Sequence, residues 1–224
     1  MILDIEFETK SPFVPPLTVQ FYTNTLDPKI VQELRQIVID EESAILSKTN
    51  PQNTDEQWAD WLTNRLWDYN LLDLDYPAIA YFKDWIGQQY LTYLKAINIK
   101  PEKVWVQCWA NLIRNDGRKI NIHNHADAHG NAPQQYSYVS GNICIHADNT
   151  KTYYASPFLN KQIFPLENVI GELVMFPSYI LHWTDPNLSD DPRISIAFDL
   201  ITEPVFTMIN NRNYRPLFNY EKNQ

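Results

Sequence analysis

Apolar residues recur at helical spacing in the first hundred residues of the chain. Residues 27–47 carry such a stripe, and Asp27-Pro28 favours a helix start because Asp caps the first turn and Pro tolerates its first position. A short amphipathic helix is predicted near residues 58–66, and a longer one over residues 77–97. The pattern predicts a helical support over residues 1–100.

β-Branched and aromatic residues dominate from residue 104 onward, which favours strands. Residues 104–113 are predicted to form a strand, and the turn at residues 114–117 to fold it into a hairpin that delivers residues 120–125. Three prolines favour edge strands within residues 1–24. Further strands are predicted at residues 138–146, 152–154, 171–176, 193–201 and, as an edge, 205–209.

The candidate chemistry lies between residues 121 and 200, which contain all five histidines. In an extended strand, side chains at i and i+2 share a face, so His125 and Asp127 can bind one metal ion. His182 then supplies a third ligand, and two His with one carboxylate leave three positions open for other ligands. Arg193 can pair with a carboxylate through two parallel hydrogen bonds, and the hydroxyl of Ser195 can add a third.

A second register of ligands is possible, in which His123 and His125 bind the metal together with His182. The His125, Asp127 and His182 set is preferred because a carboxylate balances the charge of a ferrous ion. Zinc would suit the same ligand types, but it would not require Arg193-x-Ser195. His129 and His146 are not expected to bind the metal. Three tyrosines could reach a bound carboxylate but are expected to be only half-buried: Tyr138, Tyr153 and Tyr154.

The pair His125-x-Asp127, the distal His182 and Arg193-x-Ser195 resemble the Fe(II)/2-oxoglutarate-dependent oxygenases, in their prolyl-4-hydroxylase-like branch. Residues 140–145, 171–182 and 193–198 are similar to oxygenases encoded by bacteriophages, cyanophages in particular. The resemblance covers roughly residues 104–202. It implies a viral origin and a host-cytoplasmic location.

That resemblance implies a mainly β fold, a double-stranded β-helix or cupin-like jelly roll over residues 104–211, braced by the N-terminal helices. It implies Fe(II), 2-oxoglutarate and dioxygen as cofactor and co-substrates, with ascorbate as a possible addition. Arg193 and Ser195 would bind 2-oxoglutarate. The leading expectation is hydroxylation of a peptidyl proline with release of succinate and carbon dioxide. The alternatives are another residue or a small metabolite, a non-catalytic cupin-like binding module, or a zinc hydrolase.

Composition narrows the partners. The net charge is −9 and no Lys/Arg cluster tracks a phosphate backbone, so nucleic acid is not expected as a partner. The peptide or protein substrate is expected from the family resemblance alone. No apolar run is long enough to span a bilayer and no signal peptide is evident, which predicts one cytoplasmic domain over residues 1–224. Cys108 and Cys144 lie in apolar runs and are expected to be buried thiols. The oligomeric state has no signature in the sequence.

Three further groups of residues carry predictions of their own. The polar stretch at residues 126–135 follows the first ligands and is a candidate lid. Three tryptophans are expected to pack in the core, or else to line a substrate groove: Trp58, Trp61 and Trp67. Three aspartates between the last ligand and Arg193 are expected to be solvated turn residues: Asp185, Asp190 and Asp191.

Overall fold

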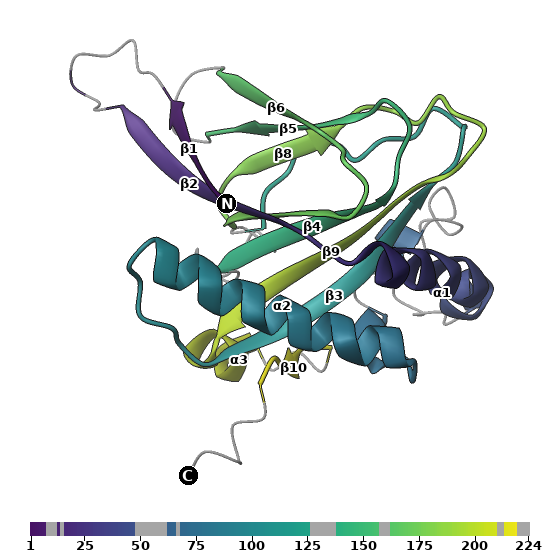
Figure 1. The fold of residues 1–224 in the computed structure, drawn as a ribbon, viewed down its shortest axis with the longest axis horizontal. Helices are drawn as coiled ribbons and strands as arrows, with labels where there is room; N and C mark the ends of the chain where they lie inside the picture. Colours follow the sequence, from purple (N-terminus) through teal and green to yellow (C-terminus); the bar gives the residue numbers. More distant parts are fainter. Residues whose placement is uncertain are drawn as a thin grey trace.

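Two antiparallel sheets make up most of the computed structural model, which describes residues 1–7, 13, 16–47, 62–65, 68–125, 138–156, 162–209 and 213–218. The larger sheet has the strand order β1-β2-β7-β4-β9-β3-β10, and the smaller one has the order β6-β5-β8 (Figure 1). The strands are β1 (Ile2–Phe7), β2 (Leu17–Thr25), β3 (Val104–Ile113), β4 (Val139–His146), β5 (Lys151–Ala155), β6 (Ile163–Glu167), β7 (Glu172–Pro177), β8 (Leu181–Thr184), β9 (Arg193–Thr202) and β10 (Arg215–Pro216).

Two long helices, α1 (Pro28–Ser47) and α2 (Pro77–Ala96), lie against one face of the larger sheet (Figure 1). Alternate residues of the central strand β9 explain this arrangement, since Ile194, Ile196, Phe198 and Leu200 join one buried core with apolar residues of both helices. The residues between them point to the other face. Strand β9 is therefore buried on both sides, with an apolar face toward the helices and a largely polar face opposite it.

A second apolar cluster lies between the two sheets. Phe21 of β2 meets Tyr154 of β5 edge-on at 5.0 Å between ring centroids, and stacks at 5.6 Å on Phe176 of β7. The ring of Phe176 also lies 5.0 Å from that of His182. The apolar cluster thus ends where the histidines begin, and it fixes the spacing of the sheets next to them.

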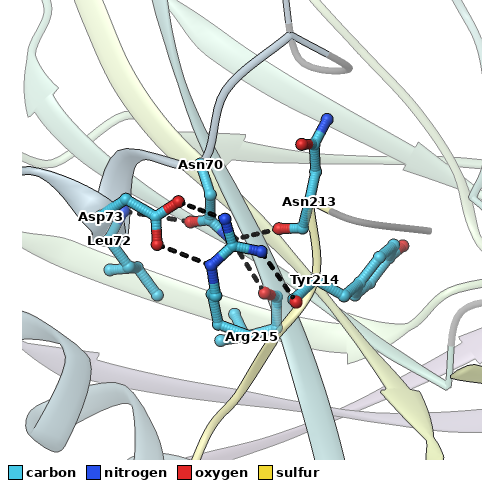
Figure 2. A network of polar contacts seen from close by, with 7 residues as sticks. Asn70, Leu72, Asp73, Asn213, Tyr214 and Arg215 are labelled. Atoms are coloured by element: carbon cyan, nitrogen blue, oxygen red, sulfur yellow. Dashed lines mark hydrogen bonds and ion pairs between the residues drawn. The ribbon is translucent and has the colours of Figure 1, made fainter.

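The short helical turn η3 (Leu71–Asp73) ties the C-terminal segment to the sheet, and the turn η2 (Leu62–Arg65) packs on β3. Arg215 of β10 donates to both carboxylate oxygens of Asp73, at 2.8 and 2.5 Å (Figure 2). Asn70 caps η3 by accepting from the backbone of Leu72, while its amide donates to the carbonyls of Val106 and Asn213. These contacts hold Tyr214, which lines the central cavity, beside β3.

The jelly roll with supporting helices is confirmed, as are the helices predicted at residues 27–47 and 77–97. The edge strand predicted at residues 205–209 is wrong, because that segment lies in the helix α3 (Glu203–Ile209). Periodicity cannot separate a strand from a helix in so short an apolar run. Pro204 in the first helical turn needs no backbone donor there, and Phe206 stacks on Trp105 of β3 at 4.8 Å, which binds the helix to the sheet.

The hairpin predicted after β3 is also wrong. Strand β9 pairs with β3 along its whole length, and on the other side the backbone N–H of Ala110 donates to the Tyr69 hydroxyl at 2.8 Å. Residues 120–125 lie along β8 instead, where the backbones of Thr184 and His182 donate to the Ile120 and His123 carbonyls. Strand β6 was not predicted, and its alternately exposed residues and central Pro165 suit an edge strand that pairs only with β5.

Both cysteines are buried and free, as predicted. Burial raises the pKa of each thiol, to about 11 for Cys144 and well above its usual value for Cys108. Among the described helices, none is long and apolar enough to cross a membrane.

Candidate active site

Three histidines from two segments meet at one end of the space between the sheets. The possible ligand nitrogens of His123, His125 and His182 all lie within 4.8 Å of one another. His123 and His182 form an antiparallel bridge, with N–H to carbonyl distances of 3.1 and 2.8 Å, and the N–H of His125 donates to the Ser178 carbonyl at 2.9 Å. The backbone therefore sets the spacing of the three rings before any metal binds.

Each ring has its Nδ1 against an oxygen acceptor. Nδ1 of His123 lies 2.7 Å from the Asn121 carbonyl, that of His182 lies 3.1 Å from the Ile180 carbonyl, and that of His125 lies 2.7 Å from each carboxylate oxygen of Asp199. An acceptor at Nδ1 places the proton there and leaves the lone pair on Nε2. The Nε2 of His125 is buried and has no hydrogen-bond partner among the described residues. Three Nε2 lone pairs in one cluster can hold a divalent metal ion.

The site also favours neutral imidazoles. Burial, followed by the nearby His125, lowers the pKa of His123 to about 4. Burial, followed by the other two rings, lowers the pKa of His182 well below its usual value. A neutral ring is the form that binds a metal, so both are ready to do so at neutral pH.

These shifts predict how the stability of the metal-free protein depends on pH. In the unfolded chain, His123 and His182 are protonated near pH 6.5. In the folded chain, His123 is protonated only near pH 4, and the pKa of His182 also lies well below 6.5. The unfolded state binds more protons between these values, so the free energy of unfolding should fall as pH drops from about 6.5 to about 4. Urea unfolding of the metal-free protein at several pH values measures this, and a smaller slope is expected in His123→Gln. A slope unchanged by that substitution would contradict the assignment.

Arg193 lies in the same cavity and is 96 % buried, with 4 % of its surface exposed. Its Nη1 has no hydrogen-bond partner among the described residues, and no ion pair to a carboxylate is formed within them. A buried guanidinium without a partner is costly, and a bound carboxylate would satisfy it through two parallel hydrogen bonds. Arg193 therefore marks one end of a site for an anionic ligand.

One face of β9 connects Arg193 to the histidines. Arg193, Ser195, Ala197 and Asp199 alternate along the strand, and all four line a cavity of about 230 Å³ that also contains the three histidines. The methyl group of Ala197 leaves the middle of this row open. The volume is below that of clefts for drug-sized ligands, roughly 300 Å³ and above, and suits a small dicarboxylate. The strand thus presents a carboxylate-binding end and a metal-binding end to one small ligand.

Ser195 is prepared as a donor by a chain of side-chain hydrogen bonds. The amide of Asn111 donates to the Ser195 hydroxyl at 3.2 Å, and the hydroxyl of Thr63 donates to the Asn111 oxygen at 2.8 Å. Because Ser195 accepts from Asn111, its own proton remains for a ligand beside Arg193. The sequence analysis missed Asn111, Thr63 and Asp199. Asn111 could have been noticed as a polar residue inside an otherwise apolar strand. Asp199 could have been noticed because it is an even number of residues from Arg193 and so lies on the same face of the strand.

The structure brings together four residues of the preferred site and one of the alternative: His125, His182, Arg193, Ser195 and His123. Asp127 lies outside the described residues, so the set of His125, Asp127 and His182 stays a prediction. The same holds for the lid at residues 126–135, for His129, and for Trp58, Trp61 and Trp67.

Other candidates lie elsewhere. The Nδ1 of His146 lies 2.9 Å from the Pro192 carbonyl, and this ring is not part of the three-histidine cluster. Tyr153 donates to Asp185 at 2.9 Å, and this aspartate also accepts the backbone N–H of Lys151. The description of Asp185 as a solvated turn residue is therefore wrong: it ties β5 to the end of β8. Tyr154 is fully buried, not half-buried as expected, and accepts from Asn142, a cavity residue, at 3.2 Å.

Comparisons with known proteins agree with this geometry. Residues 107–199 match the sequence model of a family described as "Putative 2OG-Fe(II) oxygenase". No curated protein matches the sequence.

Several solved structures share the fold. A prolyl-4-hydroxylase from Pseudomonas putida has a TM-score of 0.55 and 15% identity, over 82% of this chain and 88% of that one. A prolyl hydroxylase from Trichoplax adhaerens, in complex with a hypoxia inducible factor peptide fragment, has a TM-score of 0.55 and 11% identity, over 84% and 86%. The alpha ketoglutarate dependent epimerase SnoN of nogalamycin biosynthesis has a TM-score of 0.54 and 11% identity, over 81% of this chain and 76% of that one. The family match thus covers the strand core that carries the three histidines, Arg193 and Ser195, and the solved structures share its fold.

Proposed function

We propose that the protein is an Fe(II)- and 2-oxoglutarate-dependent dioxygenase in which His123, His125 and His182 hold the metal and Arg193 binds the far carboxylate of 2-oxoglutarate. The observation that carries the proposal is the unpartnered, buried Nη1 of Arg193 in the same small cavity as the three histidines. A non-catalytic binding module would not need both a three-histidine metal site and a buried arginine beside it. A zinc hydrolase would have no use for the buried cation.

Each group of residues has a separate task. The guanidinium of Arg193 and the hydroxyl of Ser195 would orient 2-oxoglutarate by its far carboxylate, with its other end toward the histidines. Trp109 stacks on His125, with 5.7 Å between centroids, and shields that ring from water. Bound Fe(II) would supply the chemistry by which 2-oxoglutarate, dioxygen and a substrate C–H group give succinate, carbon dioxide and hydroxylated substrate, with one oxygen atom in succinate and one in the new hydroxyl. Ascorbate would serve as an auxiliary reductant.

The decisive test is anaerobic titration of the Fe(II)-loaded protein with 2-oxoglutarate, followed by the weak visible charge-transfer band of bidentate chelation. The band is expected in the wild type. In Arg193→Ala its midpoint should rise by about 30-fold to a few thousand-fold, because loss of a buried charge partner costs about 2 to 5 kcal/mol.

The matched control is Arg114→Ala, which removes an exposed arginine paired with Glu42 on the far side of the sheet. Its midpoint should equal that of the wild type. An iron-loaded wild type without the band, or an Arg193→Ala midpoint equal to that of the control, would refute the proposal.

For the substrate we propose a peptidyl proline, hydroxylated at the 4-position. Two of the similar structures are prolyl hydroxylases, one with a peptide bound, whereas SnoN makes a small metabolite the alternative. Incubation with proline-containing peptides should give a product heavier by one oxygen atom, and matched alanine peptides should give none. Uncoupled succinate formation with every peptide would favour the small metabolite. The bacteriophage origin and cytoplasmic location stay predictions.

A further inference from the structure

We propose that Asp199 is a positioning residue that delivers to the metal centre, through His125, the negative charge that a three-histidine ligand set lacks. The inference rests on the proposed function, since it requires a metal at the three Nε2 atoms. It assigns a role to a carboxylate that is not a metal ligand itself but is hydrogen-bonded to the ligand His125.

The contact between Asp199 and His125 is close and symmetric. Both carboxylate oxygens lie 2.7 Å from Nδ1, within the range of charge-assisted hydrogen bonds. The ring of His125 also stacks on Trp109, with 5.7 Å between the ring centroids. The backbone of His125 is fixed by its hydrogen bond to the Ser178 carbonyl. With Nδ1 bound, the ring has one orientation and its Nε2 faces the other two histidines. A carboxylate at this position also makes the imidazole a stronger donor to a metal.

Asp199 is itself anchored from the neighbouring strand. The hydroxyl of Ser140, which is opposite Asp199 in the β4–β9 ladder, donates to its Oδ1 at 2.6 Å. The Ser178 hydroxyl lies 2.8 Å from that of Ser140 and continues the chain. All three side chains are buried. The carboxylate therefore has little freedom to turn away from His125.

The charge of Asp199 has no cationic side chain beside it. Within the described residues its contacts are the His125 ring and the Ser140 hydroxyl, and Arg193 lies at the opposite end of the cavity-facing row of β9. A buried carboxylate needs a compensating charge. A divalent cation at the three histidines would provide it, and the aspartate in turn would offset the charge of that cation.

Cobalt(II) is the probe that tests this inference, because its visible bands report both affinity and ligand field without turnover. Asp199→Asn keeps the size and an acceptor oxygen but removes the charge. Its cobalt affinity is expected to fall about 10- to 100-fold, with shifted bands, while the metal-free variant stays as thermally stable as the wild type. The charge control is Asp4→Asn, at an exposed position of strand β1, which should bind cobalt as the wild type does.

Ser140→Ala separates charge from packing, since it removes a hydrogen bond to the carboxylate but leaves the charge and the contact with His125. Its cobalt affinity should stay within about threefold of the wild type. The inference is overturned if Asp199→Asn binds cobalt as tightly as Asp4→Asn, or if Ser140→Ala loses as much affinity as Asp199→Asn. By contrast, failure of the wild type to bind cobalt, or unchanged binding by His182→Ala, would refute the proposed metal site itself.

Discussion

His123→Ala is expected to lose more than 99% of the protein's metal affinity, whereas Asp127→Ala is expected to keep it. The reason is geometric: the backbone bridge between His123 and His182 places both rings at the cluster, and the Nδ1 of His123 is already bound to a carbonyl. Removal of a partner outside the ligand set costs roughly 10- to 100-fold in metal affinity, so removal of a ligand should cost more than about 100-fold.

The measurement is anaerobic Fe(II) titration of four variants at one pH. His182→Ala serves as the positive control because both ligand sets include His182, and it should lose the metal. His146→Ala serves as the negative control, since that ring lies against Pro192 and outside the cluster. Loss of iron in Asp127→Ala with retention in His123→Ala would establish the set of His125, Asp127 and His182 instead.

The difference between the two ligand sets shows what local sequence can and cannot predict about this site. The i, i+2 rule places His125 with either His123 or Asp127, and nothing nearby in the chain chooses between them. The position of His123 depends on its pairing with β8, a contact between segments far apart in the sequence. Arg193 and Ser195 were predictable because one strand carries both. The contact between Asp199 and His125 could not be predicted, because the two residues are far apart in the sequence and meet only in the folded sheet.

The fold divides in the same way. Helices α1 and α2 were predicted because their apolar stripes and starts are local signals. The expected hairpin after β3 failed because a turn sequence permits a hairpin without requiring one. Gly117 does have the positive φ of 78° that such a turn needs, but β9 pairs with β3 along its whole length and the segment after the turn pairs with β8. Strand neighbours are decided by tertiary pairing, so they were the least predictable part of the molecule.

The second large effect is expected for Gly141→Ala in the middle of β4. Gly141 pairs with Phe198 of β9, and a Cβ at this glycine would lie 2.4 Å from Cζ and 2.8 Å from Cε2 of that ring. Phe198 is fully buried against the helices and has no room to move away. Overpacking of this kind costs about 1 to 3 kcal/mol or more. At about 2 to 4 °C per kcal/mol for a chain of this size, Tm should fall by roughly 2 to 12 °C.

The ring of Phe198 also connects this packing to the site, because Ala197 and Asp199 flank it on the cavity face of β9. Displacement of Phe198 should therefore weaken cobalt binding as well as lower Tm. Thermal unfolding of the metal-free protein and cobalt titration measure the two effects, and Gly141→Ala with Phe198→Leu should recover part of both. Gly117→Ala is the matched glycine control: it meets no atom within 4 Å, but its positive φ should cost about 1 to 2 kcal/mol that Phe198→Leu does not relieve. A Tm loss in Gly141→Ala that Phe198→Leu leaves unchanged would show that steric overlap with the ring is not its cause.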